Sequence, residues 1–181
     1  MAIANTNAGW VNSDGQRVKF PAEEVVKGKG GEWRDNTSIH STEFDLDFAT
    51  INLGTTDTNV YILDYDVVLP AGAIVEEIWV RTGITAWASA GDGAKLNVGL
   101  VKRSDFVTIV DADGLVNSLA ETEIDTIGGI HKIYLEDNAT GAGALLGTVL
   151  AFDSVVCVYQ ETEAWTAGTG SLVLYWRMVA E

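Results

Sequence analysis

"EFDLDF", residues 43–48, alternates acidic and apolar side chains without a break. Successive side chains of a β-strand point to opposite faces of the sheet, so Phe44, Leu46 and Phe48 share one face and the three carboxylates share the other. A strand with one dry face and one wet face is typical of an antiparallel sheet that packs against a second layer. This stretch therefore predicts a β-sandwich.

The same two-residue period recurs along the rest of the chain. It is present in "KLNVGLV" (95–101) and in "SLVLYWRMV" (171–179), and the second stretch is apolar on much of both faces, which predicts a central strand or one against a neighbouring subunit. Further strands are expected at 59–69, 73–84, 106–110, 130–135 and 149–160, with turns such as "LPAG" between them. This spacing predicts an all-β, antiparallel, jelly-roll-like sandwich over residues 35–181.

The first 34 residues differ from this body. They hold five of the 11 basic side chains but only four of the 26 acidic ones, so their net charge is +1 and that of the remainder is −16. "QRVKF" (16–20) predicts a short strand, and "KGKGGEW" (27–33) is typical of a flexible link. We expect residues 1–34 to form an extended N-terminal arm, with an ordinary loop-rich terminus as the alternative.

Composition limits the classes of function. A net charge of −15 disfavours nucleic-acid binding, which depends on Lys and Arg displacing counterions from phosphates. No apolar run approaches the roughly 20 residues that span a bilayer, and the start "MAIANTNAGW" lacks the features of a secretory signal. The single cysteine, Cys157, cannot form an internal disulfide. We therefore expect a soluble protein, made in a reducing cytosol, that binds neither nucleic acid nor membrane.

"IVDADGLVNSLA" (109–120) places two aspartates and a glycine after an apolar run. A calcium loop starting at Asp111 would need an oxygen ligand, a glycine and a glutamate where the chain has Leu115, Val116 and Thr122. The motif instead predicts a turn from a strand into one short helix, in which Leu115 and Leu119 pack on the sheet. We expect no metal and no cofactor.

Catalytic signatures are missing from the sequence. Cys157 lies in an apolar strand pattern, and the two histidines, His40 and His131, belong to no recognised catalytic or metal motif. Carboxylate pairs such as Glu76–Glu77 and Glu161–Glu163 are numerous, but solvated strand faces in so acidic a chain produce them without a catalytic role. The sequence therefore predicts that the protein is not an enzyme.

Two tryptophans stand beside glycine-rich turns, Trp87 in "TAWASAGDG" and Trp165 in "EAWTAGTG". An exposed indole in such a loop would stack on a sugar ring or anchor in a partner's pocket. The alternative is that each indole caps an open end of the sandwich core.

Four stretches, taken in order, resemble a known class of protein. They are "VVLPAGAIVEEIWVRTGITAW" (67–87), "LNVGLVKRSD" (96–105), "DADGLVNSLA" (111–120) and "WTAGTGSLVLYWRMV" (165–179). Their arrangement is similar to that of β-sandwich virion proteins of tailed bacteriophages, especially capsid decoration (cement) proteins and head-fibre modules. The resemblance covers about residues 59–180 and rests on turn chemistry.

The resemblance implies a non-enzymatic protein, made in the host bacterial cytoplasm, that binds the outer surface of the virion capsid as a homotrimer. The partners would be the major capsid protein and further copies of the chain itself. The arm would grip the capsid through Arg17, Val18, Lys19, Phe20, Lys27 and Lys29, and the subunit interface would contain Tyr175 and Val179. The alternative is a receptor- or glycan-binding module of a phage head or tail fibre that uses Trp87 and Trp165.

Overall fold

The structure is a computed structural model of the 181-residue chain. It describes residues 39–51, 53–134 and 141–179 with their side chains, and the backbone of three short strands nearer the N-terminus. These three are β1 (Trp10–Val11), β2 (Arg17–Val18) and β3 (Glu32–Arg34). The other strands are β4 (Ile39–Asp47), β5 (Tyr61–Ile62), β6 (Ala73–Thr82), β7 (Ala88–Ser89), β8 (Lys95–Lys102), β9 (Ile109–Ala120), β10 (Ile130–Tyr134), β11 (Ser154–Glu161), β12 (Trp165–Ala167) and β13 (Thr169–Met178).

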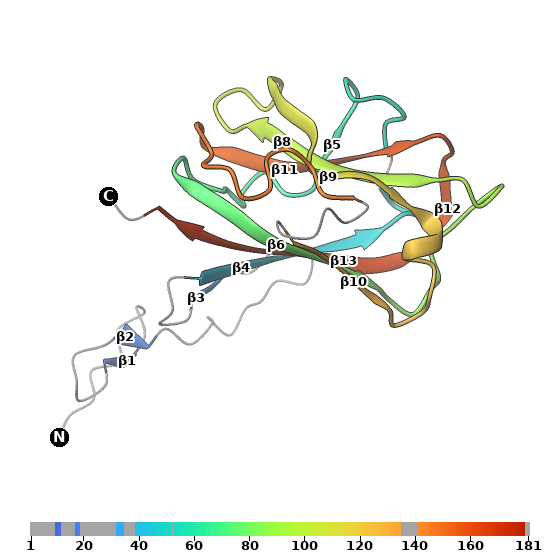
Figure 1. Cartoon of the computed structure of the whole chain (residues 1–181), viewed down its shortest axis with the longest axis horizontal. Coiled ribbons are helices and arrows are strands. Elements are labelled where there is room, and N and C mark those ends of the chain that lie inside the picture. The colour runs from blue at the N-terminus through green and yellow to red at the C-terminus, as the bar shows by residue number, and fades with distance from the viewer. Residues whose placement is uncertain are drawn as a thin grey trace.

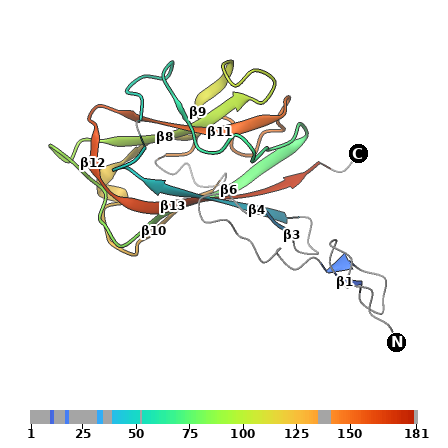
Figure 2. The same cartoon turned by 180° about the vertical axis from the view of Figure 1, so that it is seen from behind.

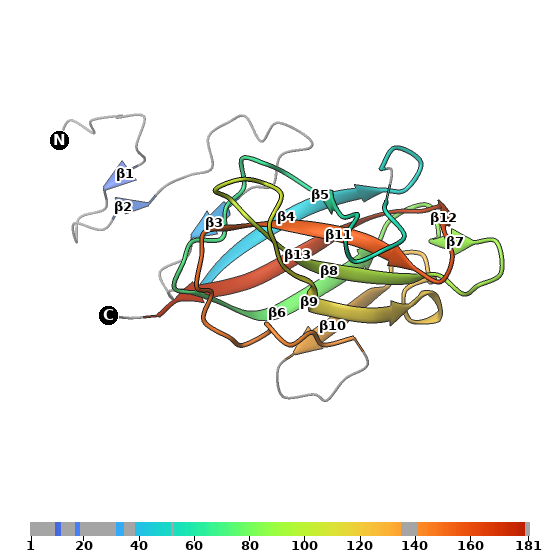
Figure 3. The ribbon, with the colours of Figure 1, turned by 90° about the horizontal axis from the view of Figure 1, so that it is seen from above.

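Two antiparallel sheets lie face to face, and the four-stranded sheet is seen over the five-stranded one in Figures 1 and 3. The five-stranded sheet has the order β10-β6-β13-β4-β3, and the four-stranded sheet has the order β5-β11-β8-β9. The jelly-roll order becomes clear when the edge strand β3 is set aside and the eight strands β4, β5, β6, β8, β9, β10, β11 and β13 are numbered 1 to 8 along the chain. The strand order of one sheet is then 1-8-3-6 and that of the other is 2-7-4-5. This is the jelly-roll arrangement, so the predicted fold class is confirmed.

The core lies between the sheets, where the alternating patterns place it. Phe44, Leu46 and Phe48 are 3%, 1% and 6% exposed, and Leu96, Val98 and Leu100 of β8 are completely buried in the same cluster. Strand β13 pairs with β4 on one side and β6 on the other, which confirms its predicted central place. Its Leu172, Leu174 and Trp176 face the core, and the alternating Val173 and Tyr175 lie on the outer face of the sheet.

A second, smaller apolar cluster covers the outer face of the four-stranded sheet. Ile62, Val101, Val155 and Cys157 are buried there, and Val60, Val68, Phe106 and Ile109 pack against them. The residues of this cluster alternate along β8 and β11 with residues of the main core, so both faces of these two strands are buried. The segments 60–68 and 103–109 thus act as a cover for this sheet.

The predicted turn and short helix at 109–120 are wrong, because these residues form one long strand, β9. Between the pairs Leu100↔Asp111 and Val98↔Val116, β8 advances two residues while β9 advances five, so β9 is strongly bulged. Gly99 faces this bulge, and a Cβ added there would lie 2.1 Å from the carbonyl oxygen of Asp111. Only a glycine permits so close an approach of the two backbones.

A segment distant in sequence explains why no helix forms there. The carbonyls of Leu115 and Gly114 accept hydrogen bonds from the amides of Gly143 (3.1 Å) and Leu145 (2.6 Å), and the Asn117 amide donates to the Gly141 carbonyl (2.8 Å). Backbone groups engaged in this way cannot also form the internal bonds of a helix. In the described part of the chain the helical element is a 3-10 turn, Glu121–Glu123, and no helix there is long and apolar enough to cross a membrane.

The two ends of the sandwich differ in what they carry. At one end β4 begins and β13 finishes, with Ile39 opposite Arg177, and we call this the terminal end. At the other end the short strands β7 and β12 pair, and we call this the β12 end; Figure 2 shows both ends from behind. Strand β3 pairs with β4, so part of the predicted arm region joins the edge of the body sheet.

Candidate functional site

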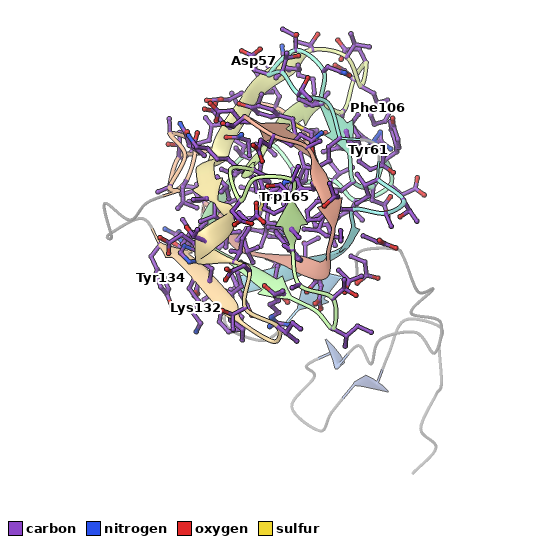
Figure 4. The ribbon with its side chains drawn as sticks, turned by 90° about the vertical axis from the view of Figure 1, so that its right-hand side faces the viewer. Asp57, Tyr61, Phe106, Lys132, Tyr134 and Trp165 are labelled. Atoms are coloured by element: carbon purple, nitrogen blue, oxygen red, sulfur yellow. The ribbon has the colours of Figure 1, made fainter. Side chains whose placement is uncertain are left out.

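Trp87 and Trp165 occupy the β12 end, but their rings are buried. Trp87 is 1% exposed and Trp165 is 6% exposed. The Trp165 ring stacks on Phe48 at a centroid distance of 5.2 Å and meets Trp87 edge to face at 5.7 Å. Figure 4, viewed from this end, shows Trp165 in the middle of the sandwich. The expectation that they are exposed binding aromatics is therefore wrong, and the alternative, that they cap the core, is confirmed.

A serine and two glutamates tie the loops of the β12 end together. The Ser89 amide donates to Glu121 (2.9 Å), and the Ser89 hydroxyl lies 2.6 Å from the Glu121 carboxylate and 3.0 Å from that of Glu163. The Gly91 amide donates to Glu163 at 2.9 Å and lowers the pKa of that carboxyl. Both carboxylates are thus engaged by the loops they hold, which gives them a structural role.

The acidic residues of β9 and β11 share the outer face of the four-stranded sheet. Burial raises the pKa of Asp113, with a further contribution from its contact with Asp111. Burial, together with the neighbouring carboxylates, raises the pKa of Tyr159 to about 12, and the Ser118 hydroxyl lowers the pKa of Glu161 by donating to it at 2.6 Å. Within residues 39–51, 53–134 and 141–179, no three His, Cys, Asp or Glu side chains are grouped so as to hold a metal ion.

We predict that a chelator leaves the melting temperature unchanged, because the calcium pattern fails at Leu115, Val116 and Thr122. Thermal unfolding followed by circular dichroism with and without EDTA tests this. A clear drop that Ca²⁺ reverses, and that is missing from the Asp111→Ala variant, would contradict it.

Cys157 lies in the small apolar cluster over the four-stranded sheet and has no exposed surface. Burial raises the pKa of its thiol to about 12, so almost no thiolate is present at neutral pH. We predict no reaction of the native protein with a soluble disulfide reagent, and one reactive thiol per chain after unfolding in guanidinium. Rapid labelling of the native protein at neutral pH would show that this cluster opens.

The outer face of the five-stranded sheet carries aromatic and charged side chains side by side. Trp79 of β6 packs against Tyr175 of β13 at a centroid distance of 4.9 Å. The Lys132 Nζ of β10 lies 3.9 Å from the centre of the Trp79 ring, and the Arg81 guanidinium lies 5.0 Å from it. Arg81 also forms an ion pair with Glu43 of β4 at 3.4 Å. The four main strands of this sheet all contribute to the surface.

This surface has the composition of a protein-binding face. Aromatic residues and arginine are enriched in protein interfaces, where large rings bury area at a low cost in side-chain entropy. A cation over the face of an indole ring is attracted to it electrostatically, which holds Lys132 and Arg81 beside Trp79. In Figure 4, Lys132 and Tyr134 lie near the bottom, on the side of this sheet, and Tyr61 and Phe106 lie on the side of the other sheet.

The residues that were predicted for the subunit interface and for the capsid-binding arm have the following positions. Tyr175 stands on the outer face of the five-stranded sheet, partly buried beside Trp79, and Val179 follows the end of β13 with 39% of its surface exposed. Arg17 and Val18 form β2, which pairs with β1. Lys19, Phe20, Lys27 and Lys29 lie outside the described residues. The sequence does not reveal the contacts of Trp79, because Tyr175 and Lys132 come from two other strands, β13 and β10.

The chain shares its fold with a protein of known structure. No model of a protein family matches it, and no curated protein matches its sequence. A chain in the structure described as "Capsid of Ralstonia phage GP4" aligns with a TM-score of 0.50 and 17% identity, over 80% of this chain and 87% of that chain. A chain of "Cyanophage Pam1 capsid asymmetric unit" aligns with a TM-score of 0.48 and 16% identity, over 93% and 97%. The first likeness shows a common jelly-roll fold.

Proposed function

We propose that this chain is a virion structural protein of a tailed bacteriophage, a decoration (cement) protein that binds the outer surface of the capsid and has no enzymatic activity. The observation that carries the proposal is the fold shared with a chain of the Ralstonia phage GP4 capsid over most of both chains. Because the coverage is high on both sides, the two chains have similar lengths and the jelly roll makes up most of each. Jelly rolls are a common architecture of viral capsid domains.

The charge of the chain supports a place on the outside of a particle. A net charge of −15 opposes contact with packaged nucleic acid and keeps decorated particles apart in solution. The proposed partners are the major capsid protein and further copies of this chain, with neither nucleic acid nor membrane. A protein that binds only the assembled shell stabilises that shell by mass action, since opening the shell requires the bound protein to dissociate.

The test is to purify shells that lack the protein, add the intact chain, and locate its density by cryo-electron microscopy. The proposal expects ordered density on the outer surface and a higher temperature of shell disruption. Failure to bind shells, or density on the tail of the complete particle, would contradict the proposal.

We predict that the protein is a homotrimer in solution. The aromatic face around Trp79 and Tyr175, together with exposed Val179, is a surface that a closed oligomer covers. Mass photometry or light scattering at micromolar concentration measures this directly. A monomer in the absence of shells would count against the trimer. Retention of the trimer after Tyr175→Ser would show that Tyr175 is not part of the trimer interface.

A further inference from the structure

A groove at the terminal end has a different character from the rest of this acidic protein. Its volume is about 830 Å³, and its walls include Ala71, Lys102, Arg103, Phe106, Phe152 and Asp153. They come from three separate stretches, namely the turn before β6, the end of β8 with the loop that follows it, and the loop before β11. The groove therefore exists only in the folded chain.

Each of the two cations in the groove is held over an aromatic ring. The Lys102 Nζ lies 3.8 Å from the centre of the Phe152 ring, and the Arg103 guanidinium lies 5.3 Å from that of Phe106. Phe152 is 46% exposed, so part of its ring is accessible to a partner. Among the described residues neither cation forms an ion pair, whereas Arg81 and Arg177 are paired with Glu43 and Glu76. Lys102 and Arg103 are thus available to a partner's carboxylates.

The carboxylates nearest to these cations are engaged by the backbone. Asp153 accepts a hydrogen bond from the Ala71 amide at 2.8 Å. Asp105 accepts bonds from the amides of Val107 (3.0 Å) and Thr108 (2.9 Å), and the Thr108 hydroxyl and these amides lower its pKa to about 2. These bonds fix the loops. Lys102 also attracts the Asp105 carboxylate and contributes to its lowered pKa, but neither Asp105 nor Asp153 forms an ion pair with Lys102 or Arg103.

The turn that carries Phe106 is held by several hydrogen bonds. Phe106 has a φ of 54°, a left-handed conformation that is costly for an aromatic residue. The turn holds it there through the Phe106 amide, which donates to the Lys102 carbonyl at 3.0 Å, and through the Asp105 bonds. Strain of this kind persists at sites where a side chain must be presented in a fixed direction.

The groove opens close to the point where the arm region joins the body. The Val179 amide donates to the Gly72 carbonyl at 3.0 Å, one residue from Ala71 in the groove wall. Arg177, two residues earlier, pairs with Ile39 at the start of β4. Residues 1–34 carry a net charge of +1 and so do not complement a cationic groove. The complementary occupant is therefore an acidic segment of another chain.

We propose that this groove docks an acidic segment of the shell protein, with carboxylates against Lys102 and Arg103 and an apolar side chain between Phe106 and Phe152. This inference rests on the proposed decoration function and names the surface and the partner chemistry that it uses. The flanking rings of Phe106 and Phe152 would exclude water from the contact between these cations and the carboxylates, which strengthens the charge pairs.

Matched single substitutions test the proposed contact between the two cations of the groove and the carboxylates of the shell protein. Lys102→Gln and Arg103→Gln remove one charge each from the groove, and Lys95→Gln removes one charge from the opposite end of the same strand, β8. We expect each groove variant to bind shells about tenfold more weakly, with a smaller dependence on salt, and the Lys95 variant to bind as the intact chain does. Equal binding by all three variants would overturn the inference.

Photocrosslinking identifies the occupant. A benzophenone amino acid at position 152 should crosslink to a shell-protein segment that contains carboxylates, whereas the same group at Ile84, which is 90% exposed near the β12 end, should not. Crosslinks from position 152 to another copy of this chain, or to a basic shell segment, would overturn the inference and leave the decoration function standing. If the intact protein fails to bind shells at all, the proposed function fails and the inference fails with it.

Discussion

Replacing Trp87 by alanine is expected to lower the free energy of unfolding by about 3–5 kcal/mol, the usual cost of truncating a buried tryptophan. The side chain is 1% exposed and packs edge to face on Phe48 at a centroid distance of 4.8 Å. Its indole N–H donates to the Thr169 carbonyl at 2.7 Å, so the substitution also removes this hydrogen bond, while the Thr169 carbonyl keeps its bond from the Gly83 amide at 2.6 Å.

The surrounding backbone is shaped to this ring, so it cannot collapse into the cavity. A Cβ added at Gly170 would lie 2.9 Å from the Trp87 ring and 2.1 Å from the Arg81 carbonyl oxygen. Urea unfolding followed by fluorescence and circular dichroism measures the loss. Ile84→Ala, in the same loop but 90% exposed, should change the stability by no more than about 0.5 kcal/mol. A loss below about 1 kcal/mol for Trp87→Ala would show that this end is loosely packed.

Deletion of residues 1–31 is expected to abolish shell binding and to leave the body folded. The deletion removes four of the five basic residues of the arm, Arg17, Lys19, Lys27 and Lys29, and retains β3, which pairs with β4. We propose that these cations steer docking and that "QRVKF" adds to an exposed sheet edge of the shell protein, with Val18 in a pocket and Phe20 beside it. Salt weakens such steering because exposed charges are screened within about 8–10 Å.

The measurement is cosedimentation of the truncated protein with shells, alongside its melting temperature. A truncated chain that decorates shells as well as the intact one would assign docking wholly to the body, where the groove around Lys102 and Arg103 is the candidate. A truncated chain that does not fold would show that residues 1–31 belong to the body. The Lys95→Gln protein serves as the control for a change of charge in the body.

Local alternation was sufficient to predict the fold class. Phe44, Leu46 and Phe48 face the core because a strand turns every second side chain to the same side, whatever its neighbours are. The burial of Cys157 followed in the same way from the apolar residues that flank it. The turn at 69–72 was also predictable from its residues "LPAG". In the structure Gly72 has a φ of 86°, a conformation that favours glycine.

The sequence by itself therefore determined the strands with a strong two-residue period, the sandwich that they imply, and the acidic character of its surface. Only the tertiary structure decided the conformation of 109–120, because its hydrogen-bond partners at 141–145 are distant in sequence and override the local preference for a turn and helix. It also decided that Trp87 and Trp165 are buried, because exposure depends on which loops meet at the end of a sandwich. The groove of Lys102, Arg103, Phe106 and Phe152 arises for the same reason, since three segments without a common sequence pattern converge there through long-range strand pairing.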